Sequence, residues 1–95
     1  MAGYLQTTAR ALEGMSKRPR SVPDLMSLLG CRRTNAEALV LRLLRNGHVA
    51  RERRTMGEVI LRRDPGGPVT RPNLVYFYST TPKGRERLRR ILGGS

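Results

Sequence analysis

The chain has 95 residues, and its 19 lysines and arginines outnumber its 7 aspartates and glutamates, which gives a formal net charge of +12. A single domain of this length can bury one small core, but it leaves little room for a deep enzyme cleft beside that core. So large a charge excess indicates a polyanionic partner, and nucleic acid is favoured over an acidic membrane surface because the chain contains no long apolar run.

The first predicted helix covers residues 3–15. Leu5, Ala9 and Leu12 recur there at helical spacing and make a modest amphipathic stripe. The basic stretch 17–20 then breaks the pattern, and we expect it to form a loop that either stays solvated or reaches a phosphate.

The second predicted helix is short and covers residues 22–29. Ser21 is a good N-cap, Pro23 is tolerated in the first turn, and Asp24 lies three residues after the cap, so the pair predicts a capping box. Gly30 ends this helix. Only four residues separate it from the next predicted helix, and such a tight turn with a glycine is typical of a helix-turn-helix.

The third predicted helix covers residues 34–46. We expect Thr34 to cap it in a second capping box with Glu37, and Gly47 to end it in the left-handed conformation. One side of the helix carries an apolar stripe that must face a core. The stripe consists of Ala36, Leu39, Val40, Leu43 and Leu44.

The opposite side of this helix has no acidic residue and is edged in arginine. Arginine can bind guanine O6 and N7, asparagine can bind adenine N6 and N7, and a small alanine allows close approach to the bases. The chemistry is that of a helix that enters a DNA major groove, and a merely solvated basic face is the alternative. The predicted DNA-contacting residues here are Arg32, Arg33, Thr34, Asn35, Ala38, Arg42 and Arg45. The outward Leu41 is interpreted as a groove contact or a subunit contact.

The segment 48–79 is predicted to be a β-hairpin. The run DPGGP at 64–68 is the strongest turn signal in the chain, so the tip lies there or in the broader loop 63–73. Gly57 marks a predicted bulge or bend. The return strand is 74–79, whose two faces alternate, and we expect one face to lie on the helices.

Six arginines of this hairpin are predicted to converge on DNA, mostly at phosphates. They are Arg51, Arg53, Arg54, Arg62, Arg63 and Arg71. A narrower hypothesis is that Arg63 or Arg71, near the tip, enters the minor groove. Three consecutive aromatic residues, Tyr76, Phe77 and Tyr78, are expected to pack in the core and at the sheet edge rather than to stack on bases.

The last predicted helix covers residues 81–92, with Thr81 as its cap and Pro82 at its first position. Leu88, Ile91 and Leu92 form a narrow apolar edge, and arginines cover most of the remaining surface. The pattern leaves three roles open for this helix: it caps the domain, takes part in a dimer contact, or lies near DNA.

This order of elements resembles the winged helix-turn-helix family. The resemblance is carried by SVPDLMSLLGCRRTNAEALVLRLLRNGHVAR, with its short helix, glycine turn, long helix and a strand opening G-x-V, and by YFYSTTPKGRERL, which is similar to the ending Y-x-x-T-x-x-G-x-x-L of MarR-like and related small prokaryotic or archaeal regulators. It implies an α+β fold with a three-helix core, a wing and a C-terminal helix in one domain, 1–95. It also implies that the helix at 34–46 enters the major groove and that the wing covers the minor groove or the backbone. The long wing and the lack of further dimerisation helices depart from the commonest members.

No enzymatic or metal chemistry is indicated. The seven acids form no convincing pair, His48 is interpreted as an ordinary surface or hydrogen-bonded residue, and the lone Cys31 as a small packing residue. We expect no cofactor, no small-molecule ligand and no membrane. A lone cysteine fits a reducing compartment, so we expect a soluble, cytoplasmic protein associated with the nucleoid.

The function predicted from the sequence is that of a sequence-specific regulator of transcription that binds double-stranded DNA as a homodimer. An RNA-binding or ribosome-associated winged helix is the alternative from another class. A non-specific, chromatin-like DNA-binding protein is the third reading, in which charge dominates and bases go unread.

Overall fold

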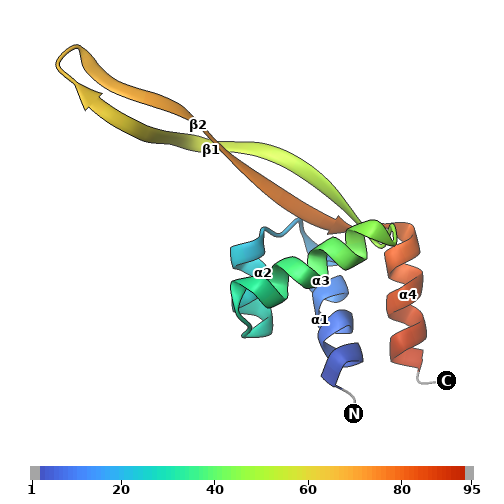
Figure 1. The fold of residues 1–95 in the computed structure, drawn as a ribbon. Helices are drawn as coiled ribbons and strands as arrows, with labels where there is room; N and C mark the ends of the chain where they lie inside the picture. The colour runs from blue at the N-terminus through green and yellow to red at the C-terminus, as the bar shows by residue number, and fades with distance from the viewer. Residues whose placement is uncertain (1–2, 94–95) are drawn as a thin grey trace.

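The computed structural model describes residues 3–93, with side chains from residue 5 onward. A compact body of helices carries one long β-hairpin that projects away from it (Figure 1), and the molecule measures 64 × 25 × 20 Å. The elements in chain order are α1 (Gly3–Lys17), α2 (Val22–Leu29), α3 (Arg33–Arg45), β1 (Val49–Asp64), β2 (Gly67–Thr80) and α4 (Pro82–Gly93). The predicted helices therefore form within two residues of their expected ends.

The core lies between α1, α2 and α3. Its largest fully buried side chains are Leu12 and Met15 of α1, Leu25 of α2 and Val40 of α3. Burying such side chains contributes about 1.5 to 3 kcal/mol each. Ala9 and Leu12 of the predicted α1 stripe are buried as expected, but Leu5 is 44% exposed, so that stripe begins one turn later than the sequence predicted.

The predicted capping box of α2 is confirmed. The Ser21 hydroxyl accepts a hydrogen bond from the Asp24 backbone nitrogen at 3.3 Å, and the Asp24 carboxylate accepts one from the Ser21 nitrogen at 3.0 Å. Gly30 then ends the helix in the left-handed conformation with φ of 64°, as expected. The short connection to α3 follows directly.

The second predicted capping box, between Thr34 and Glu37, is wrong. Helix α3 has Arg32 at its N-cap position, and no side chain caps it. Because Thr34 already lies in the first turn, the Glu37 carboxylate accepts a hydrogen bond from Arg33 Nε at 2.7 Å instead. The C-terminal end agrees with expectation, since Gly47 is left-handed with φ of 76°.

The hairpin forms one antiparallel ladder from Val49 paired with Thr80 to Asp64 paired with Gly67, so its turn is as tight as the narrower prediction required. Strand β2 is longer than the predicted 74–79. The prolines in 67–73 favoured a loop, but a two-stranded ribbon has only edge strands, where proline is tolerated.

Two register shifts interrupt the ladder, between Thr55 and Glu58 and between Ile60 and Arg62. In both, β1 carries one more residue than β2, which defines a β-bulge on β1. Gly57, with φ of 78°, lies in the first of them, and this confirms the predicted bulge.

Only the root of the hairpin belongs to the core. Val49 and Tyr78 are buried there, whereas Leu74 and Tyr76 are 50% and 41% exposed. The expectation that one face of 74–79 lies on the helices is therefore wrong for the part of the strand between Leu74 and Tyr76. The ribbon leaves the helical body at Tyr78, and these residues lie on its side toward the tip.

Hydrogen bonds attach this root to the rest of the body. The Thr80 hydroxyl donates to the Leu12 carbonyl at 2.7 Å. The backbone of Arg20 pairs with that of Tyr78, and the Arg20 Nε donates to the Gly14 carbonyl at 2.8 Å. At least this cation of the basic loop 17–20 therefore acts inside the protein rather than at a phosphate.

Candidate nucleic-acid interface

Helix α3 divides its surface as the sequence predicted. Its buried residues are Ala36, Leu39, Val40 and Leu43, while all seven predicted DNA-contacting residues are exposed, namely Arg32, Arg33, Thr34, Asn35, Ala38, Arg42 and Arg45. The outward Leu41 is 53% exposed. A helix with this surface presents one continuous face to a partner.

The exposed residues of α3 are not all equivalent, because two surface hollows flank the helix. On the side toward α1, Asn35, Ala38 and Arg42 line a hollow of about 340 Å³ together with Thr7 and Thr8. The base-reading candidates therefore lie on the flank of α3 that faces α1.

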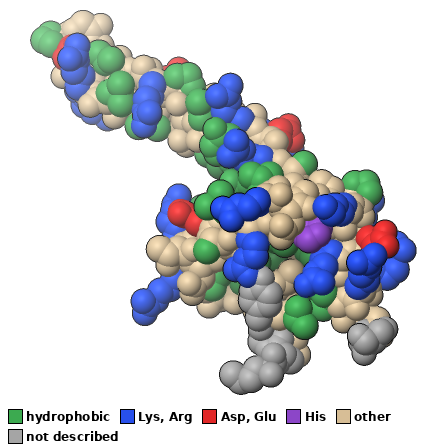
Figure 2. Space-filling view, turned by 45° about the vertical axis from the view of Figure 1, so that its right-hand side comes forward, with side chains coloured by type: hydrophobic (Ala, Val, Ile, Leu, Met, Phe, Trp, Pro, Cys, Tyr) green, Lys and Arg blue, Asp and Glu red, His purple; other side chains and the backbone are tan. Residues whose placement is uncertain are grey.

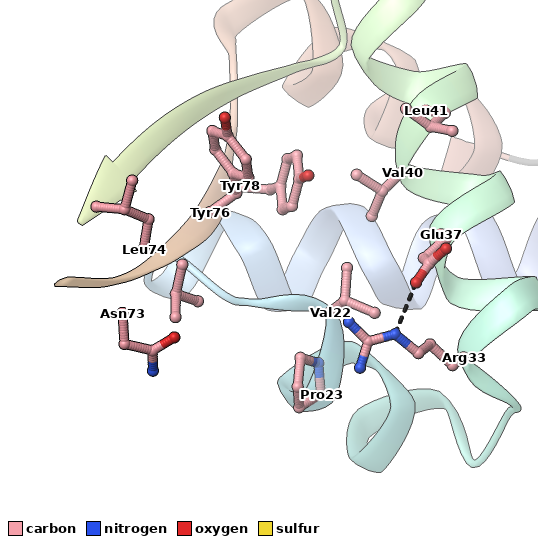
Figure 3. A pocket seen from close by; sticks show the side chains of 11 residues that line it. Val22, Pro23, Arg33, Glu37, Val40, Leu41, Asn73, Leu74, Tyr76 and Tyr78 are labelled. Carbon is pink, nitrogen blue, oxygen red and sulfur yellow. Dashed lines mark hydrogen bonds and ion pairs between the residues drawn. The ribbon is translucent and has the colours of Figure 1, made fainter. Parts of the chain in front are cut away.

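The second hollow separates α3 from the root of the wing and measures about 440 Å³. Figure 3 shows Arg33 and Glu37 on its α3 side and Leu74 and Tyr76 on its wing side. Arg33 and Glu37 form an ion pair at 2.7 Å, so together they carry no net charge. Arg33 is thus a weaker attractor of phosphate than its sequence position suggested.

The six wing arginines do not share one face of the ribbon, and their contact with DNA stays a prediction. Directly paired residues of an antiparallel ladder point to the same side, and β2 alternates without an extra residue. Two partners define the faces: Arg51 pairs with Tyr78, and Arg54 pairs with Val75. The face of Tyr78 carries Arg51, Arg53 and Arg63, and the opposite face carries Arg54, Arg62 and Arg71.

Near the root, one arginine on each face lies over an aromatic ring. The Arg51 guanidinium carbon is 4.5 Å from the centre of the Tyr76 ring, and that of Arg54 is 4.9 Å from the centre of Phe77. Such cation–π contacts contribute about 0.5 to 1 kcal/mol at exposed sites. Of the three aromatic residues that were expected in the core and at the sheet edge, Tyr78 is in the core, whereas Tyr76 is 41% exposed and packs against Arg51 on the ribbon.

Two wing arginines are also paired with acids. Arg54 binds Glu52 at 3.0 Å, which lowers the pKa of that carboxyl, and Arg62 binds Asp64 at 3.1 Å. In the described part of the chain, Arg53, Arg63 and Arg71 have neither an ion pair nor a ring contact. These three are therefore the wing cations most available to a polyanion.

The sequence left the role of α4 open between capping the domain, a dimer contact and a position near DNA. This helix carries Lys83, Arg85, Arg87, Arg89 and Arg90 against the single acid Glu86, and Glu86 pairs with Arg90 at 3.3 Å. In Figure 2, basic side chains surround the histidine on the face turned to the viewer. The pKa of His48 is lowered by burial and by the positive charges of Lys83 and Arg87. The spacing of Lys83 and Arg87, one helical turn apart, was the signal in the sequence.

Other classes of site have little support among residues 3–93. Within them, no group of three or more His, Cys, Asp or Glu side chains is placed to hold a metal ion. No described helix combines the length and the apolar character needed to cross a bilayer. Cys31 is half-buried and packs against the core, as the sequence indicated.

Comparison with known proteins identifies structural neighbours. No family model matches the chain, and no curated protein matches it either. The transcriptional regulator BldR from Sulfolobus solfataricus superposes with a TM-score of 0.64 at 22% identity, over 94% of this chain and 55% of BldR. The YusO protein from Bacillus subtilis gives a TM-score of 0.64 at 15% identity, over 93% of this chain and 52% of YusO.

A third neighbour, named "Possible transcriptional regulator" from Methanosarcina mazei Go1, gives a TM-score of 0.60 at 15% identity over 96% of this chain and 67% of that one. The chain thus spans about half the length of the first two neighbours. At these identities the likeness concerns the fold, which is α+β: a winged helix-turn-helix with a three-helix core, a long hairpin wing and a C-terminal helix.

Proposed function

We propose that this protein is a regulator of transcription that binds double-stranded DNA, reading bases in the major groove with α3 and contacting the backbone or minor groove with the wing. The observation that carries the proposal is the outward face of α3, which is exposed along its length and carries arginine, asparagine and alanine. This face matches what a recognition helix needs, since its polar groups can reach base edges while its apolar stripe stays in the core.

Charge supports the same proposal. The net charge of +12 favours a phosphate-rich partner, and three wing arginines have no acidic partner or ring contact in the described part of the chain. The wing presents cations on both of its faces, and we propose that it lies against phosphates on either side of a groove. Arg63 and Arg71, near the tip, are then the candidates for the minor groove.

Within this proposal, Asn35 and Arg42 read bases, and Ala38 allows close approach. Thr34 and the arginines Arg32, Arg33 and Arg45 contact phosphates near the two ends of α3. The likeness to two proteins named as transcriptional regulators supports a regulatory role over an enzymatic one. We also propose that the protein acts as a homodimer on a pseudo-palindromic site, because DNA-binding domains of this kind are commonly paired by a two-fold axis.

The experiment that tests this function is selection from a random duplex DNA pool at about 150 mM salt, where non-specific binding is weak. A structured RNA competes in the same tube. We expect enrichment of a motif with two inverted half-sites. Recovery of unenriched DNA would support a non-specific coating protein instead, and capture of the protein by the RNA would support the RNA-binding alternative.

A further inference from the structure

We infer that the junction of α3 and α4, formed by His48, Lys83 and Arg87, is an additional phosphate-binding surface that holds the backbone of the same DNA duplex that α3 enters. The inference rests on the proposed function and extends it to a helix outside the recognition helix and the wing. Three sets of observations carry it: the fixed geometry of the junction, its charge, and its place at the end of α3.

The start of α4 is attached rigidly to the end of α3. The Thr81 hydroxyl donates to the Gly47 carbonyl at 2.6 Å and accepts from the Gly84 nitrogen at 3.1 Å. The Thr81 nitrogen donates to the His48 carbonyl at 3.0 Å. The Lys83 side chain lies along Gly47, with its Cδ 3.7 Å from where a β-carbon on that glycine would be. The backbone at the start of α4 is therefore fixed against the end of α3, and Lys83 lies beside that end.

The junction is positively charged and lacks acidic partners. Lys83 and Arg87 are one turn apart on the same side of α4, and both act on the pKa of His48, so their charges reach the same place. The acid of α4, Glu86, binds Arg90. Within the described residues, Lys83 and Arg87 have no ion pair with a carboxylate. Like charges held together in this way are unfavourable until an anion arrives.

The junction also lies where a DNA strand would pass. Helix α3 has 13 residues, which makes it about 20 Å long. The major groove is about 12 Å wide, so a helix of this length that enters it at an angle reaches the phosphates at the groove wall with one end. The C-terminal end of α3, with the junction attached, then meets one wall. The wing projects away from the helical body (Figure 1) and is proposed to contact the duplex elsewhere.

The test uses two charge-matched double variants on the same helix. Lys83→Gln with Arg87→Gln changes the junction, and Arg85→Gln with Arg89→Gln removes the same charge from positions about 200° away around α4. Binding to the selected duplex is measured from about 50 to 200 mM salt. At about 200 mM salt, we expect the junction variant to bind at least ten-fold more weakly than the wild type. The slope of log K against log salt should be smaller in magnitude by about two, one for each lost phosphate contact. The control variant should change the slope by much less.

Several outcomes would overturn the inference. Equal losses in the two variants would mean that only overall charge matters, and an unchanged affinity of the junction variant would place no phosphate there. Neither result would contradict the proposed function. That function is contradicted instead if the wild-type protein enriches no motif in the selection from random duplex DNA. A bridging assay tests for a second duplex: the protein is bound to an immobilised duplex, and a labelled duplex is then added. If the wild type captures the labelled duplex and the junction variant does not, the surface binds a second duplex instead. Circular dichroism checks that both variants are folded.

Discussion

Gly84 of α4 lies directly against the backbone carbonyl of His48, with no room for a side chain between them. A β-carbon added at Gly84 would overlap the His48 carbonyl oxygen and approach the Thr80 side chain to 2.8 Å. This contact joins the start of α4 to the residue that links α3 to the wing. A glycine in a helix interior is normally unfavourable, so here the close packing of two backbones explains why one is present.

Replacing Gly84 with alanine should therefore destabilise the protein by about 2 kcal/mol or more, since the crowding involves backbone rather than a movable side chain. Thermal unfolding followed by circular dichroism measures the effect. Gly66→Ala is the matched control, because nothing lies within 4 Å of a β-carbon there. Equal midpoints for the two variants would contradict the close packing.

The capping box of α2 should be measurable on its own. Ser21→Ala removes the hydroxyl that accepts from Asp24 and is expected to lower the free energy of unfolding by about 1 kcal/mol. Urea denaturation gives this value. Ser27→Ala, an exposed position within the same helix, should change stability by much less, and a similar loss at both positions would argue against the cap.

The base-reading role of Asn35 predicts a loss of sequence preference. Asn35→Ala should reduce discrimination between the selected duplex and a scrambled one by about 1 to 3 kcal/mol. Arg42→Ala is expected to act in the same way. Competition binding with the two duplexes measures the preference. An equal loss of affinity for both duplexes would show that Asn35 contacts only the backbone.

The unpaired wing arginines should act on all sequences alike. Arg53→Ala or Arg63→Ala is expected to weaken binding to selected and scrambled duplexes equally, and to reduce the slope of log K against log salt by about one. Arg89→Ala, which removes the same charge from α4, serves as the control. If the wing makes no phosphate contact, the Arg53 and Arg63 variants will have the same slope as the Arg89→Ala control.

His48 predicts a dependence of stability on pH. Its pKa is lowered from 6.5 in the folded protein by burial, Lys83 and Arg87, so the unfolded chain binds more protons just below pH 6.5. Stability should then rise with pH through that window and fall as the solution is acidified from about pH 7 to pH 5. Thermal midpoints across this range should vary less for His48→Gln, which cannot take up the proton. Parallel curves for the two proteins would refute the assignment.

Local signals determined much of the fold. The Ser21 and Asp24 pair, the left-handed glycines that end α2 and α3, and the apolar spacing of α3 act over a few residues, and each formed as the sequence indicated. One local prediction failed because of a long side chain. The Arg33 Nε donates a hydrogen bond to the Glu37 carboxylate, which was expected to take part in the capping box of α3. The order of elements predicted from these signals resembled that of winged helix-turn-helix proteins, and the structural neighbours agree with that fold.

The placement of charge was decided only by the tertiary structure. Each bulge on β1 shifts by one residue which side chains share a face, so the division of the wing arginines between two faces depends on register and not on composition. The junction likewise joins residues that are far apart in the chain, because the Thr81 hydroxyl donates to the Gly47 carbonyl and Gly84 packs against the His48 carbonyl. The sequence alone determined that the protein is basic and which side of α3 is exposed. Long-range packing determined which of its cations lie close together.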